Sequence, residues 1–313
     1  MRMEIGMKAG RAFEIFVKRI LLKVGFTEVK SDGLYIFDAG AGQMIQGLGE
    51  AHNADVLLEP PVQTPFYSLS RILIECKDYQ KKVGLNTVRS VLGLKEDINH
   101  FDIVDKNELI ARRSTRRKGL TYRFDRYNYQ VAIAAMNGYT VSAQKFAATY
   151  RIPLLEFNQM PYWDEFCDIL HQEEVHEDNP KTENRIRRLA DRIGERTAVA
   201  ITNSGQLLFL YCVNGEKRFD DSMYTLHWEK QGAAWHLRCG KSTYAFQLPE
   251  SIFRLWLDKS TDELSRKKEA LHCKEEFLSN MLVYYRDLEC DAPAIKMISI
   301  DRYELKNAME KMR

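Results

Sequence analysis

The sequence predicts an α/β protein in which helices flank a mixed central sheet, followed by a C-terminal α+β accessory domain. Three observations predict this fold class. Residues 10–21 carry apolar side chains at helical spacing, short apolar runs typical of buried strands alternate with helical patterns up to residue 157, and from residue 198 strand patterns follow one another through hairpin turns. The length of 313 residues suits two domains, and a hydrophobic content of 45% is ordinary for a globular protein.

The first 160 residues carry the alternating pattern. The opening helix has apolar residues three or four positions apart, which places them on one face: Phe13, Phe16, Val17, Ile20 and Leu21. Further along, strands are predicted over residues 54–58, 72–74, 129–135 and 152–157, and helices over residues 86–98 and around residues 143–147. This order predicts one domain, residues 1–160, built around a mixed sheet.

A boundary is expected over residues 161–183. A short helix ends near residue 170, and the stretch after it is polar, acidic and interrupted by Pro180, which is typical of a linker. Residues 184–313 form a second unit without catalytic spacing, expected to serve recognition, sensing or oligomerisation. Its predicted strands cover 198–202, 206–213, 224–228, 234–239 and 243–247, and its predicted helices cover 184–193, 249–259 and 267–286.

Two carboxylates and a lysine are brought together by this pattern. Glu75 and Lys77 follow the apolar run at 72–74 two residues apart, and alternation along a strand places them on one side. Asp55 lies at the start of the preceding strand, so pairing of the two strands as a hairpin would bring it to the same point. Such a set suits a hard cation and phosphodiester hydrolysis. The other interpretation is an exposed charge ladder on an edge strand, with Asp55 an ordinary turn residue.

The order of Asp55 followed by Glu75-Cys76-Lys77 on a strand resembles the PD-(D/E)xK nuclease superfamily. Residues ~8–158 resemble its Mrr-type restriction endonuclease domains. The resemblance extends to the helix that opens with Gly10-Arg11-Ala12-Phe13-Glu14, to the glycine-bearing loop at residues 47–55, and to Gly138-Tyr139 before an alanine-rich helix. It implies the restriction-endonuclease-like fold, a mixed central sheet flanked by helices.

The resemblance also implies roles for the charged residues. Asp55 and Glu75 would bind one or two Mg²⁺ ions, which Mn²⁺ could replace, with the main-chain carbonyl of Cys76 as a further metal ligand. Lys77 would position the attacking water or stabilise the transition state. Glu14 would hold a second ion or orient water at the metal. It falls at the boundary of the apolar face of its helix, so the alternative is a solvated Glu14 outside the site.

A basic segment with interleaved tyrosines follows the predicted helix at 86–98. Its cations could neutralise phosphates and its tyrosines could stack on bases, whereas the plain alternative is a solvated loop with surface ion pairs. Residues 1–160 hold 23 Lys and Arg against 17 Asp and Glu, and the remainder holds 23 against 27, so the basic half is the half with the nuclease-like motifs. We expect nucleic-acid contacts from Arg112, Arg113, Arg116, Arg117, Lys118, Arg123 and Arg126, and also from Lys81 and Lys82.

His52 is a weaker candidate for the same site. It lies three residues before Asp55 in a glycine-flanked loop. It could be a metal ligand, a proton carrier or a hydrogen-bond donor within the loop. The sequence leaves these roles open.

The composition excludes several classes of protein. No apolar run approaches the roughly 20 residues that span a bilayer, and the N-terminus has no apolar signal core, so a cytoplasmic protein without membrane contact is expected. The six cysteines include no Cys-x-x-Cys pair, which argues against a zinc ribbon or a disulfide scaffold. A Gly-x-x-x-x-Gly-Lys-Ser/Thr motif is absent, which excludes a P-loop ATPase.

The sequence therefore predicts a metal-dependent DNA endonuclease. The resemblance implies DNA as the substrate and a role in restriction or defence against foreign DNA. A homodimer is expected because double-strand cutting normally needs two active sites. One competing hypothesis is a catalytically idle nucleic-acid-binding module on a nuclease-like scaffold, and another is an enzyme acting on a smaller phosphoester such as a nucleotide. The C-terminal unit is expected to bind a signal or a partner.

Overall fold

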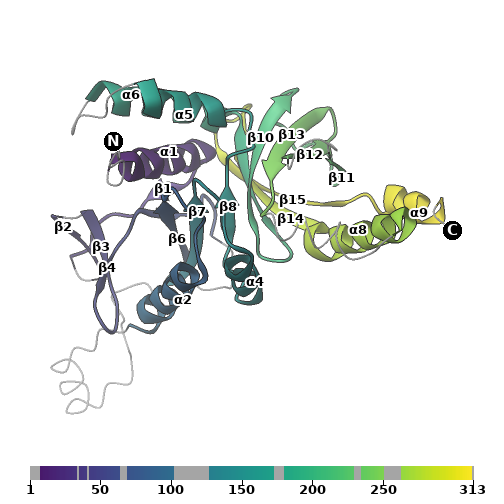
Figure 1. Ribbon diagram of the computed structural model, residues 1–313. Coiled ribbons are helices and arrows are strands. Elements are labelled where there is room, and N and C mark those ends of the chain that lie inside the picture. The colour runs from purple at the N-terminus through teal and green to yellow at the C-terminus, as the bar shows by residue number, and fades with distance from the viewer. Residues whose placement is uncertain are drawn as a thin grey trace, which may run out of the picture.

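The structure, a computed structural model, describes residues 8–33, 35–40, 42–63, 69–101, 127–172, 180–228, 234–249 and 262–311. Figure 1 shows how the helices and strands are arranged. The helices are α1 (Lys8–Val24), α2 (Leu85–His100), α4 (Val141–Thr149), α5 (Trp163–Gln172), α6 (Pro180–Glu195), α8 (Glu263–Leu278) and α9 (Arg302–Glu310). The strands are β1 (Thr27–Glu28), β2 (Ile36–Ala39), β3 (Gly42–Gln46), β4 (Ala51–Asn53), β5 (Val56–Glu59), β6 (Leu69–Lys77), β7 (Tyr127–Ala135), β8 (Leu154–Glu156), β9 (Thr197–Thr202), β10 (Leu207–Asn214), β11 (Met223–Trp228), β12 (Ala234–Cys239), β13 (Ser242–Gln247), β14 (Asn280–Arg286) and β15 (Pro293–Ile300).

A five-stranded sheet forms the centre of the first half, in the order β1-β5-β6-β7-β8. β5 is antiparallel to both of its neighbours, β1 and β6, whereas β6, β7 and β8 are parallel. In the chain, α2 lies between β6 and β7, and α4 lies between β7 and β8. Parallel neighbours need such crossovers. The predicted α/β class with a mixed sheet is confirmed at this level.

Helices cover both faces of the sheet (Figure 1). Along β7 the side chains alternate, so that Ala132 and Ala134 pack in the core with α1, whereas Val131 and Ile133 pack in the core with α2 and α4. α1 ends where Gly25 adopts a φ of +117° and donates its N–H to the carbonyl of Leu21. A left-handed residue that closes a helix in this way is typically glycine.

α1 lies between the sheet and a second helical layer made by α5 and α6 (Figure 1). Phe16 is fully buried, and its ring centre lies 4.4 Å from that of Phe166 on α5. Arg19 on α1 forms an ion pair with Asp191 on α6, with 2.5 Å between Nη2 and Oδ2. One hydrophobic core therefore runs from the sheet through α1 and α6 to β9 and β10.

The predicted boundary over residues 161–183 stays a prediction. Residues 173–179, the acidic centre of that stretch, lie outside the described residues. The helix predicted over residues 184–193 is present as α6 and begins earlier, at Pro180. Proline is well tolerated at a first helical position, because the main-chain N–H that it lacks has no partner there.

The strands of the second half close into a seven-stranded barrel, β10-β13-β12-β11-β15-β14-β9. Neighbouring strands are antiparallel except for β11 and β15. The β9–β10 hairpin was predicted from its turn, and β12 and β13 were predicted as strands, whereas the closure of the barrel was not predicted. The barrel core includes Tyr224, Trp235, Tyr244 and Phe246.

The predicted helix over residues 267–286 is wrong in its last part. α8 ends at Leu278, and the following residues form β14, which pairs with β9 on one side and β15 on the other. Met281 and Val283 alternate into the barrel core, which pairing on both sides stabilises. Residues 250–259 of the other predicted helix lie outside the described residues.

A separate three-stranded sheet, β2-β3-β4, precedes the central sheet in the chain. The sequence predicted only a glycine-bearing loop in this region. The structure places the β3–β4 hairpin there, with His52 in β4 opposite Ile45 in β3. Asp55, one of the predicted site residues, lies two residues after the end of β4, so the chain passes directly from this small sheet to the site.

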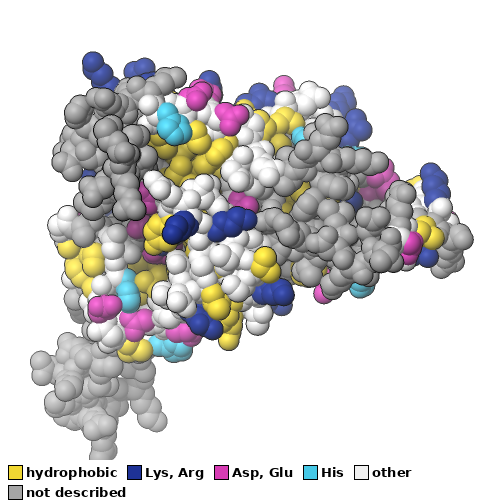
Figure 2. All heavy atoms as spheres, in the orientation of Figure 1, with side chains coloured by type: hydrophobic (Ala, Val, Ile, Leu, Met, Phe, Trp, Pro, Cys, Tyr) yellow, Lys and Arg dark blue, Asp and Glu magenta, His cyan; other side chains and the backbone are white. Residues whose placement is uncertain are grey.

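The described surface has few features that bear on localisation. None of the helices in this part of the chain is long and apolar enough to cross a membrane. Five cysteines are described as free thiols: Cys76, Cys167, Cys212, Cys239 and Cys290. In Figure 2, Lys and Arg side chains lie along the upper edge of the view, over the layer formed by α5 and α6.

Candidate active site

Asp55, Glu75 and Lys77 meet at one end of the central sheet. Lys77 Nζ donates to Oε2 of Glu75 at 2.8 Å, and it lies 3.8 Å from Oδ2 of Asp55. The three side chains are 12%, 14% and 19% exposed for Asp55, Glu75 and Lys77. They are therefore mostly shielded from water but still reachable from solvent. The convergence that the sequence predicted for these three residues is present, and an exposed edge ladder is not.

Strand pairing explains where Asp55 lies. β5 and β6 are antiparallel, with Val56 opposite Ile74, so the residue before Val56 reaches the level of Glu75 and Cys76. Oδ2 of Asp55 accepts the main-chain N–H of Cys76 at 2.9 Å. This side-chain hydrogen bond extends the hydrogen bonding between β5 and β6 by one position beyond Val56. It also fixes the orientation of the Asp55 carboxylate.

Glu14 enters the site from α1. Burial raises its pKa to about 7, and the negative charge of Asp55 contributes to the increase. Lys77 and Arg11 act in the opposite direction. Glu14 is therefore half-buried and electrostatically coupled to Asp55, which favours a place in the site over a solvated position outside it.

Asp78 fixes the start of α1 beside this cluster. Its carboxylate accepts a hydrogen bond from the main-chain N–H of Gly10, at the open end of the helix. Burial raises the pKa of Asp78. Strand alternation gave no reason to single out this residue, because its contact is with a helix that lies far away in the sequence. The neighbour of Lys77 thus anchors the helix that carries Glu14.

The charges within the cluster act on one another. Burial raises the pKa of Glu75, the Lys77 ammonium lowers it, and the Asp55 carboxylate raises it again. Burial alone would lower the pKa of Lys77, but Glu75 and Asp55 together raise it above its ordinary value. Lys77 is therefore a cation at neutral pH, suited to stabilising negative charge and unsuited to accepting a proton.

The donor set fits Mg²⁺ by its chemistry. Asp55 and Glu75 place two carboxylates against the Lys77 ammonium, and Glu14 lies within electrostatic range of Asp55 and Lys77. The set carries an excess of negative charge that a divalent cation would offset. Mg²⁺ is usually held by one or two carboxylates together with water and substrate phosphate. In the part of the chain that is described, no three His, Cys, Asp or Glu side chains are grouped closely enough to hold a metal ion by themselves.

Cys76 presents its main chain and not its thiol to this end of the sheet. The side chain is buried in the core with α1, as alternation predicted, and burial raises the thiol pKa well above its ordinary value. A nucleophilic thiol needs a lowered pKa. The side chain of Cys76 is therefore structural, and its carbonyl remains the predicted metal ligand.

His52 is bonded to α2 through a residue that the sequence did not suggest. Its Nε2 lies 2.7 Å from Oδ2 of Asp97. The carboxyl pKa of Asp97 is lowered, first by this hydrogen bond, so Asp97 is the acceptor and the imidazole Nε2–H is the donor. The charge of His52 also lowers the pKa of Glu75. Of the roles left open for His52, hydrogen-bond donor is the one that the structure contains.

The predicted nucleic-acid contacts are for the most part not described. Lys81 and Lys82 are exposed in the connection between β6 and α2, just beyond the site. The remaining residues lie outside the described residues: Arg112, Arg113, Arg116, Arg117, Lys118, Arg123 and Arg126.

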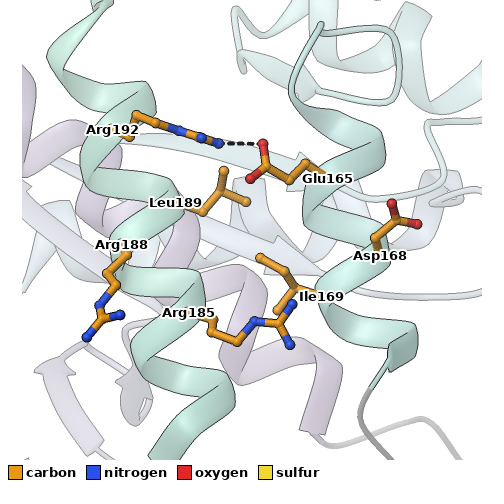
Figure 3. Close-up of a pocket in the computed structure, with 7 residues that line it drawn as sticks. All are labelled: Glu165, Asp168, Ile169, Arg185, Arg188, Leu189 and Arg192. Carbon is orange, nitrogen blue, oxygen red and sulfur yellow. Dashed lines mark hydrogen bonds and ion pairs between the residues drawn. The ribbon is translucent and has the colours of Figure 1, made fainter.

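A shallow groove lies between α5 and α6, away from the carboxylates (Figure 3). Its volume is about 370 Å³, its floor is formed by Ile169 and Leu189, and Arg192 spans it to pair with Glu165. The other charged residues of the groove are Asp168, Arg185 and Arg188. Three cations face two anions, so the groove lacks the strong single-sign field of a catalytic phosphate site.

Comparisons with known proteins add little. Neither a family model nor a curated protein matches this chain. Among solved structures, the chain is similar to the crystal structure of AF1548, a protein of unknown function. The two share 17% sequence identity and a TM-score of 0.32, over 58% of this chain and 78% of that chain. A likeness at that TM-score carries no argument about fold or function.

Proposed function

We propose that this protein is a metal-dependent DNA endonuclease that hydrolyses phosphodiester bonds at Asp55, Glu75, Lys77 and Glu14. The observation that carries the proposal is the position of Lys77 Nζ, 2.8 Å from Glu75 and 3.8 Å from Asp55, at the end of a mixed sheet. A cation between two shielded carboxylates, with a third carboxyl coupled to this cluster electrostatically, suits a reaction in which negative charge builds up on phosphorus.

The arrangement of elements supports the proposed membership of the PD-(D/E)xK superfamily. Apart from β1–β4, which lie between α1 and β5, the order is helix α1, antiparallel strands β5 and β6, crossover α2, parallel strand β7, crossover α4 and parallel strand β8. Asp55 precedes the first of these strands, and Glu75 and Lys77 end the second. We propose the finer, restriction-endonuclease-like fold on the basis of this arrangement together with the Mrr-like motifs of residues ~8–158.

Each residue has a distinct part in the proposed reaction. Asp55, Glu75 and the carbonyl of Cys76 would hold Mg²⁺ or Mn²⁺. The ion, when bound, would neutralise phosphate charge and make the attacking water more acidic. Lys77 holds its ammonium toward the reacting phosphate and stabilises the added negative charge. Glu14, with a pKa of about 7, can accept a proton from water at neutral pH.

DNA as the substrate and a role in restriction or defence rest on the resemblance. The proposed homodimer rests on the two active sites that double-strand cutting normally needs, and the proposed cytoplasmic location rests on the sequence composition. Lys81 and Lys82 support the choice of a polyanionic substrate because they are exposed next to the site. The barrel of the second half would supply recognition or regulation, since it shares a hydrophobic core with α1.

A second candidate is a binding module that no longer cleaves. It is favoured by one observation: the Lys77 ammonium already pairs with both Glu75 and Asp55, so each of these carboxylates has a cationic partner without a ligand. A scaffold could retain such a network for stability. Under this alternative the protein would bind nucleic acid in a salt-dependent manner and would not cut it.

Cleavage assays separate the two candidates. Purified protein is incubated with supercoiled and linear DNA in Mg²⁺, Mn²⁺ or EDTA, alongside Glu75→Ala and Lys77→Ala. The endonuclease proposal expects cleavage in either metal, none in EDTA and none by either variant. Salt-sensitive gel shifts without cleavage by the folded wild type would favour the binding module. Cleavage that persists in both variants would place the active site elsewhere.

A further inference from the structure

Asp97 accepts hydrogen bonds from the β3–β4 turn and from β4, which lie far from it in the sequence. Oδ1 accepts the main-chain N–H of Gly49 at 2.9 Å, and Oδ2 accepts Nε2–H of His52 at 2.7 Å. The main-chain carbonyl of Asp97 also accepts the N–H of Leu48, at 3.3 Å. One residue of α2 therefore binds both the β3–β4 turn and the following strand.

The turn is shaped to admit this carboxylate. A Cβ atom on Gly47 would lie 2.0 Å from Oδ2 of Asp97 and 2.7 Å from the carbonyl oxygen of Glu50. No side chain fits there, so glycine is what lets the main chain close around Asp97. The N–H of Gly47 donates to the Glu50 carbonyl at 2.9 Å, which closes the turn. We refer to Gly47–Glu50, His52 and Asp97 as the Asp97 clamp.

The Asp97 clamp is connected to the proposed active site through a short piece of chain. From His52 only two residues intervene before Asp55, and the amide of Asn53 donates to Oδ1 of Asp55 at 3.3 Å. On the other side, α2 starts eight residues after Lys77, and its last turns carry Asp97. The clamp thus ties the segment that carries Asp55 to the helix that follows Lys77.

We infer that Asp97 is a positioning residue, which acts through His52 and the Gly47–Glu50 turn to hold Asp55 against Cys76. The inference deepens the proposed function, because a displaced Asp55 would also weaken metal binding at that site. Its structural part can be measured without metal. The Cys76 N–H donates to Oδ2 of Asp55, so hydrogen exchange at this one amide reports where the carboxylate lies.

Two substitutions of His52 separate positioning from proton transfer. Glutamine places an amide N–H near the position of the imidazole Nε2 and can still donate to Asp97, whereas alanine cannot. A purely positioning His52 is therefore replaced well by glutamine. A proton-carrying His52 is not, because an amide does not titrate at neutral pH. The exposed neighbour Glu96, whose carboxylate pairs with His100 on the same helix, provides a matched control.

The experiment measures amide exchange by NMR, and Mn²⁺ binding by calorimetry, in the full chain. The variants are Asp97→Ala, His52→Ala, His52→Gln, Glu96→Ala and the double variant Asp97→Ala with His52→Ala. We expect Asp97→Ala and His52→Ala to speed exchange at Cys76 and to weaken Mn²⁺ binding about tenfold, the low end for residues that orient metal ligands. His52→Gln and Glu96→Ala should match wild type, and the double variant should be no worse than either single one.

The outcomes distinguish the inference from the proposed function. Unchanged Cys76 exchange in folded Asp97→Ala would overturn the inference, whether or not the protein cleaves DNA. His52→Gln as damaged as His52→Ala would also overturn it, because the imidazole would then act by itself. If the wild type binds no Mn²⁺ while the two alanine variants still speed Cys76 exchange, the positioning role stands and the metal-dependent function fails.

Discussion

Lys77 Nζ lies 2.8 Å from Oε2 of Glu75, although the two residues are only two apart on one strand. Both side chains leave the sheet on the same side, and the nearby Asp55 carboxylate completes a cluster in which one cation lies against two anions. Because this cluster is shielded from water, each charge affects its neighbours more than it would on the surface. The following predictions depend on that electrostatic coupling or on the core that supports it.

Removing the central cation should destabilise the fold. In Lys77→Met the methylene stem is kept but Glu75 and Asp55 lose their counter-charge, so we expect a loss on the order of 1–3 kcal/mol in the free energy of unfolding at neutral pH. Urea titration measures it. Lys81→Met, an exposed lysine in the same connection, is the control and should change stability by less than about 0.5 kcal/mol. Equal stability of Lys77→Met and wild type would mean that Lys77 is solvated and not part of a coupled cluster.

Glu14 should make stability depend on pH. Its pKa rises from 4.5 in an exposed carboxyl to about 7 in the fold, so the folded state binds the proton more tightly. The stabilising contribution of the protonated form is complete below about pH 4.5 and is lost as the pH rises through about 7. Glu14→Gln mimics the protonated form. In EDTA it should therefore be more stable than wild type at about pH 8, with the difference shrinking toward about pH 5.

The comparison of Glu14→Gln with wild type can also contradict the place of Glu14 in the site. If Glu14→Gln and wild type show parallel unfolding free energies across that range, Glu14 is solvated and the site reduces to Asp55, Glu75 and Lys77. Glu165→Gln is a suitable control, since this exposed glutamate lies on α5 in a surface ion pair with Arg192.

The packing of α1 predicts a large effect from Phe16→Ala. The ring is fully buried between the sheet and α5, where truncation leaves a cavity among Phe157, Tyr162 and Phe166. We expect a loss of about 3–5 kcal/mol in the free energy of unfolding, measured by chemical denaturation. Tyr303→Ala, at a position 75% exposed, should cost little. A loss below about 1 kcal/mol for Phe16→Ala would contradict the packing of α1 between the two layers.

The shared core predicts that residues 1–160 do not fold as a stable unit. In that fragment α1 loses its contacts with α5 and α6, which exposes Phe16 and Ile20 to water. Circular dichroism and one-dimensional NMR should show a poorly dispersed, aggregation-prone chain, whereas the full chain unfolds cooperatively. A well-folded fragment with native-like stability would instead support an autonomous nuclease domain.

Local patterns were enough to predict much of the central sheet. The helix spacing of Phe13, Phe16 and Ile20, and the apolar run ending in Glu75 and Lys77, each repeat at the period of the element that they form. The site cluster could be predicted for the same reason, because alternation and a hairpin fix which side chains share a side. Contacts that bring distant segments together could not be predicted in this way.

Asp97 and the barrel illustrate what sequence patterns leave out. Asp97 sits on a helix face with no motif around it, and its partner His52 lies 45 residues earlier in the chain. β14 was predicted as helix because its strand conformation depends on pairing with β9 and β15 on both sides. In both cases the deciding interaction is tertiary, and such interactions override local propensity.

The central claim is tested most directly by the rate at which the full-length protein nicks supercoiled plasmid in Mg²⁺, compared with Glu75→Gln under identical conditions. Glutamine keeps the size of the side chain and removes only the charge that would hold the metal. The account predicts nicking by wild type that EDTA abolishes, and a rate at least about a hundredfold lower for Glu75→Gln with its fold intact. Equal rates for the two proteins, or nicking that survives EDTA, would contradict it.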